Sequence, residues 1–265
     1  MKFGNLSRLA SVGLIGLASS AHAVDVTVNS TQPEVAGSNY QTINAALNYV
    51  RTQPEPRTVR IVGGGPYEEN MAINFSVTVK GDGYRPIIAT PQTSGLPHPA
   101  SLDGNGVSIY TTADSGGPIT VRLENLVLIP STTNAPTGST SRAIRANNNN
   151  AGGGLTPDLM NIELVDLLIT SNNGSNAPVT NDGLSQADLT GAISYGDDGI
   201  HISGNTNLTI TGTIVSNIYG TGNTNDGLVF NPDAAGYTLT VGPGCVFSYM
   251  NRIGIQIARN GSIVR

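Results

Sequence analysis

The stretch MNIELVDLLITSN (160–172) decides the fold, because it holds two short β-rich strands separated by a tight turn. The same arrangement returns in ITVRLENLVLIPS (119–131), NLTITGTIVSN (207–217) and YTLTVGPGCVFSY (237–249), although the letters differ each time. When such a unit recurs along a chain, each copy forms part of one coil, and successive coils stack on one another. The sequence therefore predicts a parallel β-solenoid, whose function lies on its long side faces and in its protruding loops.

Shorter apolar strands introduced by glycine turns lie between these units, at 200–202, 228–230 and 253–257. Gly199, Gly227 and Gly254 mark them at almost equal intervals, which predicts compact, regular coils in this part of the chain.

The spacing is longer earlier in the chain, when Leu126, Leu167 and Ile214 are aligned as equivalent positions of successive coils. Both intervals exceed the roughly 20–30 residues that one coil of this type takes, so we expect inserted loops. The segments 91–107 and 131–158, rich in Ser, Thr, Asn, Gly and Pro, are the candidates.

One helix is predicted, over SNYQTINAALNYV (38–50), with Ser38 or Asn39 as its cap. Ile43, Ala46, Leu47 and Val50 form one apolar stripe along it. An uncovered coil would expose a strand edge that is prone to aggregate. We therefore expect an all-β protein, a right-handed parallel β-helix whose N-terminal end this helix covers.

Residues 1–23 have the pattern of a secretory signal peptide, with Lys2 and Arg8 before an apolar stretch and Ala21-His22-Ala23 at the expected cleavage site. We expect a secreted protein, in the extracellular space, on the cell surface or in the periplasm. Residues 24–265 form a single β-helix domain in this interpretation, with no segment long enough to span a membrane. No capping helix follows the strand at 253–257. This pattern predicts either a domain truncated at its C-terminus or an open last coil that a partner covers.

The composition excludes some classes of protein. The formal net charge is −5, so a basic surface for nucleic acid is not expected. A single cysteine, Cys245, allows no intramolecular disulfide bond.

Candidate chemistry lies in Tyr195-Gly196-Asp197-Asp198-Gly199-Ile200-His201-Ile202. Alternation along the strand places His201 on the outward face, opposite Ile200 and Ile202. Asp182 lies one short coil before the two acids, and Asp226 lies one regular coil after Asp198. Stacked coils would place these aspartates in a column, about 5 Å apart from coil to coil.

Such a column of carboxylates has three possible roles. Two carboxylates can act as acid and base in glycoside hydrolysis. The column can instead bind Ca²⁺ through its oxygen ligands. It can also form Asx turns, in which each side chain accepts a hydrogen bond from a backbone amide.

The N-terminal part resembles the first coil of the pectin-lyase-like superfamily, notably pectin methylesterases and pectate lyases. The matching segments are YQTINAAL (40–47), RIVGGGPYEENMAI (60–73) and VTVKGDG (77–83). This resemblance implies the β-helix fold and carries none of the family's catalytic residues. Pectate-lyase-type elimination would need Ca²⁺ and an arginine or lysine base, for which Arg142, Arg145, Arg252 and Arg259 are available.

The segment GDDGIHI (196–202) resembles the Gly-Asp-Asp motif of the polygalacturonases, and Asn181-Asp182-Gly183 resembles their upstream motif. The resemblance implies catalytic roles for Asp182, Asp197 and Asp198. The family's Gly-His-Gly motif is missing, and His201 stands inside the strand instead. Asn251-Arg252-Ile253 is similar to the family's carboxylate-binding motif, although Gly254 replaces its lysine.

Two functions follow from the sequence. The first is a secreted protein that acts on or binds a polysaccharide, a pectin-like acidic glycan by resemblance. Its catalytic candidates are Asp182, Asp197, Asp198 and His201, and its substrate-binding candidates are Tyr195, Asp226 and Arg252. A protein of net negative charge would need either Ca²⁺ or local arginines to hold such a polyanion. The alternative is a non-catalytic surface scaffold or adhesin-type module. The first predicts converging carboxylates that backbone amides leave free, and the second predicts that every aspartate is hydrogen-bonded to a backbone amide.

Overall fold

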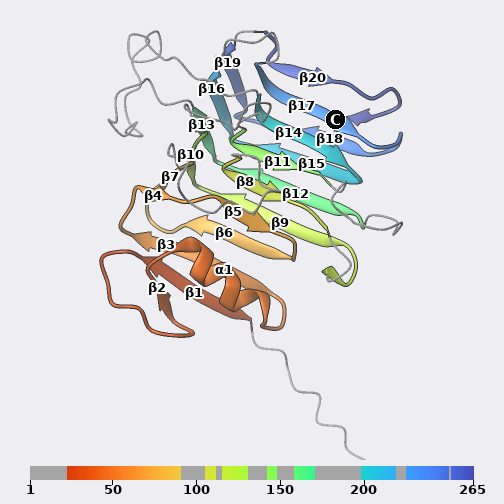
Figure 1. Ribbon diagram of the computed structural model, residues 1–265. Coiled ribbons are helices and arrows are strands. Elements are labelled where there is room, and N and C mark those ends of the chain that lie inside the picture. Colours follow the sequence, from red (N-terminus) through yellow and green to blue (C-terminus); the bar gives the residue numbers. More distant parts are fainter. Residues whose placement is uncertain are drawn as a thin grey trace, which may run out of the picture.

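The chain folds as a right-handed parallel β-helix in the computed structural model (Figure 1), which describes residues 23–90, 105–111, 115–130, 142–147, 158–170, 198–218, 225–250 and 252–265. Three sheets run the length of the solenoid, and the strands that follow one another in a sheet come from successive coils. All pairings between the named strands are parallel, for example β9 with β12 and β14 with β17. The predicted fold class is confirmed.

Sheet A has nine strands in the order β2 (Asn39–Tyr40), β1 (Val24–Asn29), β3 (Arg57–Gly63), β6 (Val77–Gly81), β9 (Ile119–Glu124), β12 (Met160–Val165), β15 (Thr206–Thr211), β18 (Thr238–Val241) and β21 (Ile263–Val264). Sheet B contains β4 (Tyr67–Glu68), β7 (Ile87–Ala89), β10 (Val127–Ile129), β13 (Leu168–Thr170), β16 (Ile214–Ile218) and β19 (Val246–Met250). Sheet C contains β5 (Met71–Ile73), β8 (Val107–Ile109), β11 (Ile144–Ala146), β14 (Asp198–Gly204), β17 (Asp226–Pro232) and β20 (Ile255–Ile257).

The corner between sheets A and B is a tight turn with one residue in the left-handed region. Asn125, Asp166 and Gly212 occupy this position with φ values of 56°, 52° and 59°. Short Asx side chains and glycine tolerate that conformation best. At Gly212 a Cβ atom would also lie 2.0 Å from Oδ1 of Asp166, so a larger residue there would require the Asp166 side chain to move.

Alternate residues of the strands point inward and form one continuous apolar core, which extends from the helix to the last coils. A smaller apolar cluster of Val127, Ile129 and Leu168 lies on sheet B apart from this core. Among the described residues, no helix has the length and apolarity needed to cross a membrane.

The helix α1 spans Ile43–Arg51, so the prediction that it begins at residue 38 was wrong. Asn39 and Tyr40 instead pair with β1 as the short strand β2, and Thr42 is the N-cap in place of Ser38 or Asn39. The predicted stripe of Ile43, Ala46, Leu47 and Val50 is buried. Figure 1 shows α1 at the N-terminal end of the solenoid, beside β1 and β3.

The coil register differs from the predicted alignment at one place. Ile214 pairs with Leu168 and not with Leu167, because Thr213 takes the corner position that Leu126 and Leu167 fill in the preceding coils. The Thr213 hydroxyl accepts a hydrogen bond from the Leu167 amide at 3.4 Å and lies 3.2 Å from the Thr211 carbonyl oxygen, to which it donates. The predicted regular spacing of the last coils is confirmed by the pairing of Asp198 with Asp226 and of Leu228 with Ile255.

Candidate functional site

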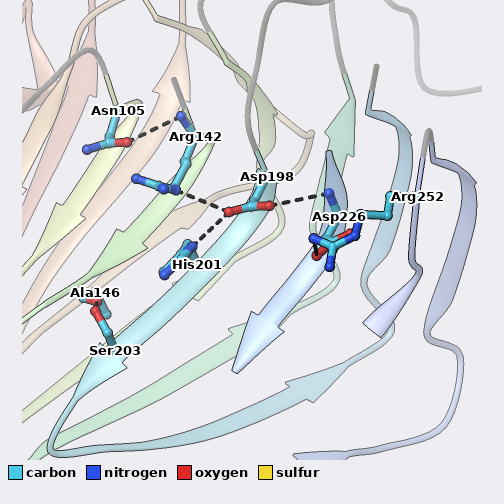
Figure 2. Close-up of polar contacts among 8 residues, drawn as sticks. All are labelled: Asn105, Arg142, Ala146, Asp198, His201, Ser203, Asp226 and Arg252. Atoms are coloured by element: carbon cyan, nitrogen blue, oxygen red, sulfur yellow. Dashed lines mark hydrogen bonds and ion pairs between the residues drawn. The ribbon is translucent and has the colours of Figure 1, made fainter. Parts of the chain in front are cut away.

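A row of polar residues follows the corner where the chain enters sheet C (Figure 2). Asn105, Arg142, Asp198 and Asp226 each stand two residues before the first inward-pointing residue of their strand. The register of β8, β11, β14 and β17 stacks these four positions one coil above another. We call this row the corner ladder.

The corner ladder links its coils through hydrogen bonds that backbone amides donate to side-chain oxygens. Oδ1 of Asn105 accepts from the Arg142 amide at 3.2 Å, and Oδ1 of Asp198 accepts from the Asp226 amide at 3.3 Å. Oδ1 of Asp226 accepts in turn from the Ile253 amide at 3.1 Å. Each acceptor thus satisfies the amide that begins the corner of the next coil, which fixes the register where the chain enters sheet C.

The second oxygen of each carboxylate forms an ion pair. Oδ2 of Asp198 lies 2.7 Å from Nδ1 of His201 and 3.2 Å from Nε of Arg142. Oδ2 of Asp226 lies 3.3 Å from a terminal nitrogen of Arg252.

Both carboxylates are buried, with the side chains of Asp198 and Asp226 only 3% and 1% exposed. A buried carboxylate is tolerated when its oxygens are hydrogen-bonded and its charge is paired, and these two meet both conditions.

His201 is the member of this cluster that faces away from the core. It lies on β14 between the inward-pointing Ile200 and Ile202, and its side chain is 22% exposed. In the neutral form of the imidazole, Nδ1 donates to the Asp198 carboxylate and Nε2 is left as the acceptor. Such a fixed tautomer can accept a proton or a hydrogen bond from a ligand.

Ser203 lies two residues further along the same face, and its hydroxyl donates to the Ala146 carbonyl at 3.0 Å. Figure 2 shows this hydroxyl directed at Ala146, away from His201.

Close packing between coils explains why glycine follows both aspartates. A Cβ atom on Gly199 would lie 2.8 Å from the Gly227 carbonyl oxygen, and one on Gly227 would lie 2.6 Å from that of Gly254. Real Cβ atoms essentially never come this near to backbone. The Asp-Gly pairs are therefore what a tightly stacked corner requires, whether or not the aspartates have any chemical role.

The structure brings together four of the residues predicted from sequence. Asp198, His201, Asp226 and Arg252 form one chain of contacts across neighbouring coils. Asp182, Tyr195 and Asp197 lie outside the described residues.

Sequence reasoning missed Asn105 as a member of this row and gave Arg142 no specific place in it. The signal that could have found both is their position two residues before Val107 and Ile144, the first apolar residues of their strands. Asp198 and Asp226 stand in the same way two residues before Ile200 and Leu228. In the part of the chain that the structure describes, no group of three or more His, Cys, Asp or Glu side chains could hold a metal ion.

Comparisons with protein-family models, with curated protein sequences and with solved structures find no match to this chain. The β-helix is thus established from the geometry of the chain itself, and its function has to be inferred from its own residues.

Proposed function

We propose that the protein is a non-catalytic exported β-solenoid, a surface scaffold in which the corner aspartates serve the fold. The observation that carries this proposal is the bonding of Asp198 and Asp226. One oxygen of each accepts a backbone amide from the next coil, and the other oxygen is ion-paired. Export is proposed from the signal-peptide pattern of residues 1–23.

Glycoside hydrolysis needs carboxyl groups that can reach the substrate, and the hydrogen bonds and ion pairs of Asp198 and Asp226 work against this. A general acid has to present its proton to the glycosidic oxygen, and the second carboxylate has to reach a water molecule or the sugar carbon. Asp198 and Asp226 are nearly inaccessible, and moving either toward a substrate would break the link to the following coil. Protonation of Asp198 would also remove the negative charge that lies 3.2 Å from Nε of the buried Arg142.

A second candidate is a protein that binds or acts on a polysaccharide, as the resemblance to the pectin-lyase-like superfamily implies. The Asp198–His201 pair favours it, because a buried carboxylate that holds a partly exposed imidazole is an arrangement suited to a general base. In this candidate His201 is the working residue, and Asp198 is the residue that positions it.

A glycan screen separates the two candidates. The purified protein is incubated with polygalacturonate, methylated pectin or alginate, with Ca²⁺ and with EDTA, while reducing ends and unsaturated products are measured. The scaffold proposal predicts no product from folded protein. Cleavage that is lost in His201→Ala and kept in Gln256→Ala, an outward-facing control two coils further on in sheet C, would replace it with the enzymatic candidate.

A further inference from the structure

The outer face of sheet C has a row of three polar side chains on successive coils. Ser108, Arg145 and His201 occupy paired positions of β8, β11 and β14, so each residue lies beside the next. Their neighbours along each strand belong to the apolar core, which places all three side chains on the outward face. Neighbouring strands lie about 4.8 Å apart, so a small ligand at Arg145 is within reach of the residues on both sides.

The charge of this face favours an anionic ligand. The outward positions of the described strands of sheet C bear no acidic side chain; they are Ala72, Ser108, Arg145, His201, Ser203, Val229, Asn231 and Gln256. The Asp198 carboxylate at the adjoining corner is ion-paired with Arg142 and hydrogen-bonded to His201. The face is therefore positive at Arg145, within a chain whose net charge is −5.

Ser108 is an independent indication that a ligand binds here. The residue is only 6% exposed, and its hydroxyl has no hydrogen-bond partner in the part of the chain that the structure describes. Buried polar groups in native proteins are nearly always hydrogen-bonded, to a bound water or ion where not to protein. An oxygen atom of a bound anion would supply the acceptor that this hydroxyl needs.

His201 indicates which anion fits. Its Nδ1 faces Asp198, as Figure 2 shows, so Nε2 is on the other side of the ring and is an acceptor in the neutral imidazole. An acceptor beside an arginine selects a ligand that has an O–H group next to its anionic oxygens. Hydrogen phosphate has both groups at neutral pH, whereas sulfate has no proton to donate. A guanidinium has five N–H donors, so Arg145 can bind the anion and keep a contact with the protein.

We propose that Ser108, Arg145 and His201 form a binding site for inorganic hydrogen phosphate. The O–H group of the anion donates to Nε2 of His201, and its other oxygens accept from Arg145 and from the Ser108 hydroxyl. The site goes beyond the scaffold function proposed above, and it does not depend on whether the protein has a catalytic activity.

Calorimetric titration of the purified protein tests the choice of anion. Sodium phosphate, sodium sulfate and glucose 6-phosphate are compared at equal ionic strength and at pH 8, where a histidine side chain is ordinarily neutral. We expect saturable binding of phosphate and at least about tenfold weaker binding of sulfate. Glucose 6-phosphate should bind as weakly as sulfate, because a phosphate ester has lost its last proton at this pH. No binding of phosphate, or equal binding of phosphate and either competitor, would overturn the proposal.

Two variants test the position of the site. Ser108→Ala should weaken phosphate binding about tenfold without lowering the melting temperature, because the hydroxyl has no partner among the described residues to lose. Arg145→Gln should abolish binding, while Arg51→Gln, which removes the same charge from an exposed position on α1, should have no effect. If Arg145→Gln does not fold, Ser108→Ala carries the test alone. Unchanged phosphate affinity in either folded variant would place the ion elsewhere and overturn the assignment.

Discussion

At the scale of single residues, the corner ladder shows how short polar side chains hold stacked coils in register. Asn105, Asp198 and Asp226 each place one oxygen where the amide of the next coil needs an acceptor. Asp and Asn suit this position, because their short side chains reach the neighbouring backbone with few rotatable bonds. The ladder therefore accounts for these residues without requiring a substrate.

Tyr67 provides a residue-scale prediction on pH. Burial raises the pKa of its phenol, whose hydroxyl donates to the Gly63 carbonyl and accepts from the Ser30 amide at 3.3 Å. A phenol with a raised pKa stabilises the fold fully below its unfolded value of about 10, and this stabilisation is lost as pH rises through the folded pKa.

We therefore expect the midpoint of thermal unfolding to fall more steeply above pH 10 for the wild-type protein than for Tyr67→Phe. Melting curves between pH 8 and pH 11 measure the difference, with Tyr237→Phe as the control for loss of a tyrosine. Parallel pH profiles of wild type and Tyr67→Phe would show that this phenol does not contribute.

The sequence predicted part of the corner ladder at this scale. The stacking of Asp198 on Asp226 follows from the regular spacing of the last coils, because no large insertion interrupts the coil between them. Asn105 and Arg142 belong to coils whose spacing is stretched by inserted residues, so coil spacing did not align them with Asp198. Only their position two residues before an apolar strand indicates their place in the row. The sequence did not predict the hydrogen bonds between coils either, since an aspartate before a glycine is compatible with a turn, a metal site or an active site.

At the scale of elements, α1 is attached to the solenoid through its N-terminus as well as its apolar stripe. Oγ1 of Thr42 accepts from the Ala45 amide at 3.2 Å. The carboxylate of Glu69, which lies between β4 and β5, accepts from the Ile43 and Asn44 amides at 2.8 and 2.9 Å. A negative group at this end also interacts favourably with the helix dipole. Local sequence patterns do not reveal this contact, because its partners are 25 and 26 residues apart.

Glu69→Ala should therefore destabilise the protein by about 1–2 kcal/mol, because two amides at the helix N-terminus lose their charged acceptor. Denaturant unfolding measures this loss. Glu68→Ala, the adjacent and exposed glutamate on β4, is the matched control and should change stability by less than about 0.5 kcal/mol. Equal effects of the two substitutions would mean that Glu69 does not cap α1.

At the scale of the whole molecule, the sequence was most informative about what repeats. Alternating strands, glycine corners and regular spacing predicted the parallel β-helix, because every coil has to meet the same geometric demands. It was less informative about what occurs once, such as the start of α1 at Ile43, which depends on the pairing of Asn39 and Tyr40 with β1. Function belongs to this second kind of feature, because a site is built on a fold and is not dictated by it.

The central claim is that the corner aspartates hold the coils together, and the unfolding free energy of Asp198→Asn tests it most directly. The substitution keeps the size of the side chain but removes the buried negative charge that contacts Arg142 and His201, so we predict a loss of about 3 kcal/mol or more. Asp25→Asn, at a half-exposed ion pair with Arg60, should cost less than about 1 kcal/mol. Unchanged stability of Asp198→Asn, together with loss of a glycan-cleaving activity that the wild-type protein possesses, would contradict the account and make Asp198 a catalytic residue.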